Sequence, residues 1–167
     1  MQALVRNFRR RWRERVEPEL PKDGGRTVRE LVTLASIVEK EARLAEERAL
    51  IAAVYGNRLD QGMGLFADPT VIYALKLAGR WDGNIRKADL QIDSPYNTYR
   101  KPGLPPGPIA NPGLASLRAA AAPATTPYYY FVARNDGSHV FSTNAAEHNA
   151  NVEKYQRQYF RDRRRGK

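Results

Sequence analysis

The chain has 167 residues, a net charge of +10, 42% apolar residues and no cysteine, a composition that supports one domain with its own core. The absence of cysteine excludes a disulfide scaffold, thiolate metal sites and a cysteine nucleophile. The two histidines lack a metal-ligand spacing, and no apolar run reaches the roughly 18 residues of a membrane span. We therefore expect one soluble domain over residues 1–167, with no metal and no other cofactor.

The positive charge is concentrated at the two ends of the chain. Residues 1–30 carry +4 and residues 150–167 carry +5, which leaves +1 for everything between them. A nucleic-acid groove usually has Lys and Arg along its folded surface, with aromatic residues between them. The simpler interpretation is solvated helix faces. A basic nucleic-acid-binding module stays open as an alternative, although no nucleic acid is expected as partner.

A charged helix is predicted over residues 3–17. Pro18 and Pro21 end it, because proline cannot donate the backbone hydrogen bond that would continue a helix. The sequence Lys-Asp-Gly-Gly at 22–25 then predicts a turn.

Three further helices are predicted before residue 80. Thr27, with Glu30 three residues later, forms a capping-box pattern, and a second helical stretch covers 45–60. Asp68 followed by Pro69 fits a helix cap with proline at the first helical position. The apolar residues that recur at helical spacing after Thr27 are Leu31, Leu34, Ile37, Val38 and Leu44.

The segment 95–112 holds six of the eleven prolines. It must be a loop, and proline lowers the entropy that such a loop loses on ordering. The tyrosines of Tyr-Asn-Thr-Tyr at 96–99 would have nothing to pack on in a solvated linker, so we favour an ordered wall of a cleft. A solvated linker is the alternative.

The last part of the chain predicts a short helix over 114–122, a β-hairpin and a final helix. Residues 128–133 are aromatic and strand-like, the turn residues Asn-Asp-Gly-Ser follow at 135–138, and 139–142 form the partner strand. The final helix is predicted over 145–161. The fold class is therefore α+β, a helical core with a small late hairpin and a long Pro-rich loop.

Glu41 is the carboxylate whose position on its helix indicates a possible proton donor. Its side chain points within about 40° of the centre of the apolar stripe, whereas Glu39 lies about 120° away, at 100° per residue. A carboxyl on an apolar face has a raised pKa and can donate a proton near neutral pH. Alternatively, Glu41 pairs with Lys40, Arg43 or Arg48 on the helix surface, and Asp68 is explained by its role as a cap.

A series of motifs in a fixed order resembles one known family, the membrane-bound endolytic murein transglycosylases, also called MltG or YceG-like proteins. The resemblance covers roughly residues 30–155. The matching segments are LASIVEKE at 34–41, NRL at 57–59, GM at 62–63, DPTVIY at 68–73, YNTY at 96–99, GLPPGPI at 103–109, NPG at 111–113, PY at 127–128 and YFV at 130–132, followed by His139, Phe141, Thr143, His148 and Asn149.

This resemblance implies a lysozyme-like cleft that cleaves the β-1,4 bond between N-acetylmuramic acid and N-acetylglucosamine within peptidoglycan strands. The reaction uses no water and leaves a 1,6-anhydromuramoyl end, so one carboxyl acting as acid and then as base suffices. Its context in related enzymes, before a small residue, favours Glu41 over Glu39. The residues expected to bind the glycan are Asp68, Tyr96, Asn97, Thr98, Tyr99, Asn111, His148 and Asn149.

Members of the family normally carry an amino-terminal transmembrane helix and a small LysM-like module, and this sequence has neither. The resemblance therefore implies a catalytic fragment of a single-pass inner-membrane protein, anchored through the missing segment, with this domain on the periplasmic side. Cell-wall synthases are the implied protein partners. Two alternatives remain open: a catalytically silent peptidoglycan-binding domain, and a hydrolase that uses Asp68 or Asp93 as a second carboxyl.

Overall fold

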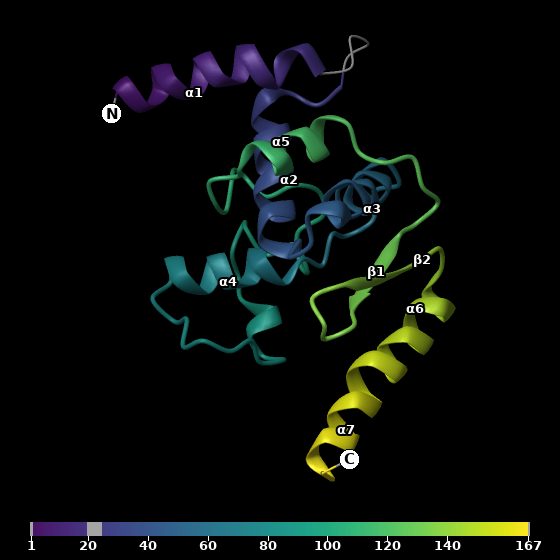
Figure 1. Cartoon of the computed structure of the whole chain (residues 1–167). Helices are drawn as coiled ribbons and strands as arrows, with labels where there is room; N and C mark the ends of the chain where they lie inside the picture. The colour runs from purple at the N-terminus through teal and green to yellow at the C-terminus, as the bar shows by residue number, and fades with distance from the viewer. Residues whose placement is uncertain (1, 20–24, 167) are drawn as a thin grey trace.

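The structure is a computed structural model that describes residues 2–19 and 25–166. It is mostly helical, with one two-stranded antiparallel sheet late in the chain (Figure 1), so the α+β prediction is confirmed. The predicted turn at 22–25 lies outside the described residues, except for Gly25. The elements are α1 (Gln2–Arg15), α2 (Val28–Glu41), α3 (Arg48–Asp60), α4 (Asp68–Leu77), α5 (Leu114–Ala121), β1 (Tyr130–Ala133), β2 (His139–Ser142), α6 (Ala145–Val152), a π-helical stretch (Glu153–Gln158) and α7 (Tyr159–Arg164), with short 3-10 turns at Glu17–Glu19, Ala45–Glu47 and Asp89–Gln91.

Helix α2 is the central element. The predicted capping box begins it: the Thr27 backbone N–H donates to Glu30 at 2.7 Å, and the Glu30 N–H donates to the Thr27 hydroxyl at 3.3 Å. The middle of the helix, residues 31–38, is buried except for the half-buried Val32, because the helix packs against α3, α4 and α5. A helix surrounded in this way has a fixed direction, so whatever stands at its C-terminal end is held firmly.

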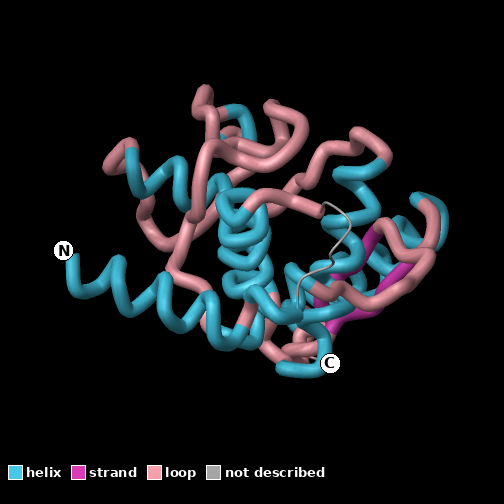
Figure 2. Tube along the Cα trace, turned by 90° about the horizontal axis from the view of Figure 1, so that it is seen from above, coloured by secondary structure: helices cyan, strands magenta, loops and turns pink. Residues whose placement is uncertain are grey.

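The two basic helices lie at opposite ends of the molecule. Figure 1 shows α1 across the end where α2 begins, and α7 pointing away at the other end. Seen from above, α1 runs along one edge, and the strands lie on the far side from the N-terminus (Figure 2). This separation does not favour a single basic groove of the kind that binds nucleic acid.

The Pro-rich loop packs against α2. The Ser36 hydroxyl accepts a hydrogen bond from the Ile109 N–H at 3.0 Å, and the Arg29 side chain donates to the Pro106 carbonyl at 3.0 Å. Pro105, Gly107 and Ile109 are buried. These contacts show an ordered segment rather than a solvated linker, because a linker would have none of them; of this segment, only Tyr99 lines the cavity described below.

The hairpin pairs Tyr130 with Ser142 and Ala133 with His139. Its turn residues have the backbone that the sequence predicts, since Asn135 and Gly137 have φ angles of 70° and 97°. Asn57 of α3 fastens the segment leading into the hairpin, donating two hydrogen bonds of 2.9 Å to the carbonyls of Thr126 and Tyr128. The hairpin is therefore tied to the helical core.

Three local predictions need correction. Asp68 is the first residue of α4 rather than its cap, which is Ala67, and its carboxylate is used elsewhere. Strand β1 begins at Tyr130 rather than at 128. The final helix is interrupted by the π-helical stretch, where Gln156 donates to the Ala133 carbonyl at 2.7 Å and Asn135 donates to the Tyr155 carbonyl at 2.6 Å. Contacts with the hairpin at this point override the regular helical period.

Candidate active site

A cavity of about 760 Å³ opens where the C-terminal end of α2 meets the hairpin. Its helical wall comes from α2, α3, the start of α4 and neighbouring loops. Its opposite wall comes from the hairpin, α6 and the π-helical stretch. The lining residues are Glu41, Tyr55, Arg58, Leu65, Phe66, Asp68 and Tyr99 on the helical wall, and Tyr130, Phe131, Val132, Ala133, His139, His148, Val152 and Gln156 on the hairpin wall.

Glu41 is the last residue of α2, and its carboxyl faces the cavity. The hydroxyl of Tyr55, a fully buried residue of α3, donates a hydrogen bond of 2.8 Å to Glu41 Oε1. Among the residues that the structure describes, no Lys or Arg forms an ion pair with Glu41. The surface pairing with Lys40, Arg43 or Arg48 is therefore not what holds this carboxyl.

Burial is the main influence on the pKa of the Glu41 carboxyl. Burial raises the pKa of its carboxyl from an ordinary value of 4.5 to about 7, and the negative charge of Asp68 adds to the rise. The hydrogen bond from Tyr55 acts in the opposite direction, because it stabilises the carboxylate. Burial also raises the pKa of the Tyr55 hydroxyl well above its ordinary value, so this group stays a donor. Near neutral pH Glu41 is thus poised to give up a proton and to take one back.

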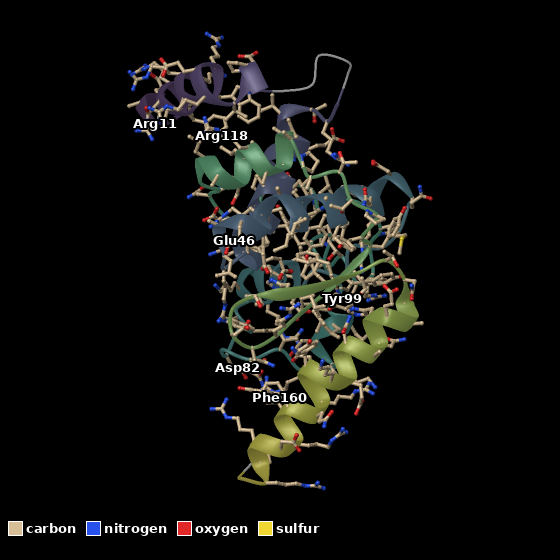
Figure 3. All side chains as sticks on the ribbon, turned by 45° about the vertical axis from the view of Figure 1, so that its right-hand side comes forward. Arg11, Glu46, Asp82, Tyr99, Arg118 and Phe160 are labelled. Carbon is tan, nitrogen blue, oxygen red and sulfur yellow. The ribbon has the colours of Figure 1, made fainter. Side chains whose placement is uncertain are left out.

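Asp68 lies at the same end of the cavity and has its own donor. The Tyr99 hydroxyl donates to Asp68 Oδ1 at 2.6 Å, across 31 positions of sequence. Burial, and then the bond to Asp68, raise the pKa of the Tyr99 hydroxyl. The exposed ring of Phe66 packs against Tyr99 with ring centroids 5.4 Å apart, and Phe66 has a φ of 50°, which is strained for a non-glycine residue. Figure 3 shows Tyr99 among the inner side chains, whereas Arg11 and Phe160 lie at the periphery.

Arg58 joins the two walls. The residue is 8% exposed, and its guanidinium donates to the carbonyls of Tyr129 at 2.6 Å and Leu65 at 2.8 Å. The same guanidinium lies over the ring of Tyr130, with the central carbon 5.0 Å from the ring centroid. Arg58 therefore fixes the start of the hairpin relative to α3.

Two histidines stand on the hairpin wall. His148 of α6 stacks on Tyr130 with ring centroids 5.2 Å apart, and burial, aided by the positive charge of Arg58, lowers the pKa of its imidazole. This keeps the ring neutral at pH 7, and its Nδ1 is buried without a partner among the described residues. His139 is held by a buried carboxylate, Glu47, through a contact of 2.7 Å to Nδ1 and a bond from its backbone N–H at 2.9 Å.

Glu39 has a different environment from Glu41, although it lies two residues away. Its carboxylate accepts from the Ser116 hydroxyl at 2.5 Å and from the Gly113 N–H at 3.2 Å. Both donors belong to the start of α5, so Glu39 joins α2 to α5. It does not line the cavity.

The residues expected to bind a glycan are separated by the fold. Asp68, Tyr99 and His148 come together in the cavity lining. Asn97 and Thr98 are buried: the Asn97 amide donates to the carbonyls of Leu90 and Ile92, and Thr98 bonds to Thr70 at 2.9 Å. These two shape the loop that carries Tyr99. Tyr96, Asn111 and Asn149 do not line the cavity either; Tyr96 packs on Tyr73, whereas Asn111 and Asn149 are exposed.

Sequence reasoning did not single out Tyr55, Arg58 or Glu47 for roles in the site. Arg58 stood inside the motif NRL, but nothing in the residue pattern marked its guanidinium as buried. Tyr55 lies 14 positions after Glu41, on another helix, so no helical spacing connects the two residues. One signal could have identified Tyr55: it is a tyrosine on the buried face of a helix, and a buried hydroxyl needs a hydrogen-bond partner.

No group of three metal-ligating side chains occurs within residues 2–19 and 25–166. Over the same part of the chain, no helix has the length and apolar character needed to cross a membrane.

The comparisons with known proteins agree with one another. A model of the YceG-like family matches residues 1–154. The chain belongs to the YceG-like family. It is 48% identical over 129 residues to a protein of Bacillus subtilis named endolytic murein transglycosylase, and 39% identical over 132 residues to a protein of the same name from Streptococcus pneumoniae. The crystal structure of a YceG-like protein from Listeria monocytogenes matches 89% of the chain, with a TM-score of 0.74 and 41% identity.

The matches cover only part of these YceG-like relatives. The aligned regions span 77% and 75% of this chain but 35% and 23% of the Bacillus and Streptococcus proteins. In the Listeria structure the match covers 46% of the chain. The match to the family model, over residues 1–154, includes Glu41 and the rest of the helical wall.

Proposed function

We propose that this domain is a lytic transglycosylase that cleaves the β-1,4 bond between N-acetylmuramic acid and N-acetylglucosamine inside peptidoglycan strands. The observation that carries the proposal is the carboxyl of Glu41, which faces the cavity, has a pKa of about 7 and accepts a hydrogen bond from Tyr55. The names of the Bacillus and Streptococcus relatives support the same class of reaction. Because peptidoglycan lies outside the cytoplasm, the domain would work there.

Glu41 acts first as the general acid in this proposal. The protonated carboxyl gives its proton to the glycosidic oxygen while the bond between that oxygen and the muramoyl C1 breaks, and the departing sugar leaves as an alcohol. A pKa near 7 suits this step, because a carboxyl with its ordinary pKa of 4.5 would be almost fully ionised at neutral pH.

Glu41 then acts as the base. Its carboxylate takes the proton from the muramoyl C6 hydroxyl as that oxygen attacks C1, which closes the 1,6-anhydro ring and returns Glu41 to its starting state. The Tyr55 hydroxyl stabilises the carboxylate between the two steps by its 2.8 Å bond to Oε1. This bond leaves Oε2 for the reacting atoms.

The cavity offers a suitable lining for the sugars around the bond. Asp68 and the Tyr99 hydroxyl form one polar pair, and the stacked rings of Tyr130 and His148 form an aromatic surface with a neutral imidazole. Sugars with acetamido groups need aromatic faces and neutral donors or acceptors of this kind. We assign these four residues to substrate binding.

The test is mass spectrometry of the products from uncrosslinked peptidoglycan strands incubated with the chain. The variants are Glu41→Gln, Glu39→Gln as the competing carboxyl, and Glu46→Gln as a matched change at an exposed position. We expect anhydromuramoyl ends from all proteins except Glu41→Gln. Reducing ends would instead indicate a hydrolase, and anhydro ends from Glu41→Gln would overturn the assignment of the acid.

A further inference from the structure

A second groove, of about 250 Å³, runs along α4 beside the cavity. Its lining comes from four segments: Lys40 at the end of α2, the face of α4 that includes Pro69, Tyr73 and Lys76, Trp81 in the loop that follows, and Ile109 of the Pro-rich loop. Nothing in the proposed reaction uses these residues.

The groove and the cavity lie close together, because α2 and α4 each contribute neighbouring residues to both. Lys40 directly precedes Glu41, and Pro69 directly follows Asp68, so each chain segment contributes one residue to the groove and the next to the cavity. Figure 1 shows α4 beside the C-terminal end of α2, on the side opposite the hairpin. A ligand bound at Glu41 that carries a branch toward α4 would therefore enter the groove.

The floor of the groove is apolar and firmly packed. The ring of Tyr73 is backed by Tyr96, with ring centroids 4.7 Å apart. Trp81 packs against the small core formed by Val71, Leu75 and their neighbours. Rings that are fixed in this way lose little entropy when a ligand lies on them.

The rim of the groove is positive. Lys40 and Lys76 are exposed, and neither forms an ion pair with any residue that the structure describes. The lining contains no acidic side chain. An anionic and partly apolar ligand is what this combination fits.

We propose that the groove binds the peptide stem attached to the muramoyl sugar at the cleavage site, an inference that rests on the proposed function. In a strand that carries stems, the lactyl carboxyl of each muramoyl sugar is used in the amide bond to its stem, so the glycan backbone has no charge for two ammonium groups to neutralise. The stem itself carries several carboxylates and apolar side chains, whereas a strand without stems has a single lactyl carboxylate on each muramoyl sugar. The face of α4 from Pro69 to Lys76 extends roughly 10 Å, at 1.5 Å per helical residue, which is the length of about three extended peptide residues. The stem, rather than a further sugar, therefore matches the groove in charge and in length.

The test compares the affinity for uncrosslinked glycan strands with stems and for the same strands after enzymatic removal of the stems. All measurements use Glu41→Gln, so that binding does not depend on turnover and is separate from the assay for anhydro ends. The test variant adds Lys40→Ala and Lys76→Ala. The matched control adds Lys87→Ala and Lys101→Ala, two exposed lysines that do not line the groove.

We expect about fivefold tighter binding of the strands with stems, a preference that the test variant loses, the control keeps and 0.5 M salt reduces. With Trp12→Phe added, Trp81 is the only tryptophan, and its emission should shift with stem-bearing strands alone. Equal affinity for the two kinds of strand, no binding of either, or a preference that survives in the test variant would each overturn the inference. Because anhydro ends are scored separately, loss of the stem preference and loss of the proposed reaction are distinguishable.

Discussion

The two walls of the cavity are built differently. The helical wall presents Glu41 and Tyr55 from two helices of the core, and Tyr55 is fully buried. Along the hairpin wall, every lining residue is partly exposed, from Tyr130 of β1 to His148 of α6. A group that must transfer a proton at a fixed position gains from the first environment, whereas a surface that must accept a long, variable substrate gains from the second. In the proposed reaction the proton transfer belongs to the helical wall, whereas substrate binding is shared between Tyr130 and His148 on the hairpin wall and the pair Asp68 and Tyr99 on the helical wall.

The sharpest way to test this division is Glu41→Gln. The amide cannot donate or accept the proton, so we expect kcat to fall by about 10²–10⁴-fold. The measurement is the rate of formation of anhydromuramoyl ends. The folded structure should survive, because the amide has the size of the carboxyl, and a thermal unfolding curve near that of the parent would demonstrate it.

The link between the walls can be broken at Arg58. In Arg58→Met the carbonyls of Gly64, Leu65 and Tyr129 lose their donor, and we expect the free energy of unfolding to fall by about 3 kcal/mol or more. Urea unfolding measures this change. Arg58→Lys is the control, since it keeps the charge but not the planar fork, and it should recover only part of the loss. Full recovery would show that charge alone joins the walls.

The raised pKa of Glu41 should also make stability depend on pH. The raised pKa of Glu41 means that the folded chain binds a proton more tightly than the unfolded chain does. Between pH 4.5 and about 7 the contribution of Glu41 to stability therefore declines as the pH rises, by up to about 3 kcal/mol, and then levels off. Urea unfolding across this range should show the decline in the parent and a flatter profile in Glu41→Gln. Parallel profiles would contradict the raised pKa.

Tyr55→Phe separates positioning from chemistry on the helical wall. It removes the hydrogen bond that stabilises the carboxylate, so the pKa of Glu41 should rise further and the alkaline limb of the pH-rate profile should move to higher pH. We expect kcat to fall by about tenfold, the equivalent of one hydrogen bond. A purely structural role would lower stability without moving the limb.

The smallest effect is expected on the hairpin wall. His148→Ala removes the ring stacked on Tyr130, which costs about 1 kcal/mol or less of stability. We expect KM to rise severalfold while kcat changes little, as measured in the same product assay. A large fall in kcat with unchanged KM would place His148 among the catalytic groups and would remove the distinction between the walls.

The local sequence predicted much of the scaffold. The capping box at Thr27 marked the start of α2, and the turn residues 135–138 marked the hairpin, because both signals act over three or four neighbouring residues. The apolar stripe of α2 likewise indicated that Glu41 faces inward. The π-helical stretch escaped prediction, since it depends on contacts with the hairpin about 20 residues earlier in the chain.

The candidate site was only partly predictable for the same reason. The sequence analysis named both Asp68 and Tyr99, but their hydrogen bond spans 31 positions, and no local sequence pattern predicted it. Asn97 and Thr98 looked as suitable for a glycan as Tyr99 beside them, and only the tertiary structure buries their side chains.

The sequence by itself therefore determined the helices, the hairpin and the inward direction of Glu41, because helical periodicity and turn chemistry are properties of adjacent residues. The family was indicated separately, by the resemblance of an ordered series of motifs. The tertiary structure decided which groups surround that carboxyl. Tyr55 reaches it from another helix, Arg58 binds a carbonyl 71 positions away, and Glu47 holds a histidine 92 positions away. Such pairs form only when packing brings distant segments together, and packing is also what excludes the water that would otherwise keep the pKa of Glu41 at its ordinary value.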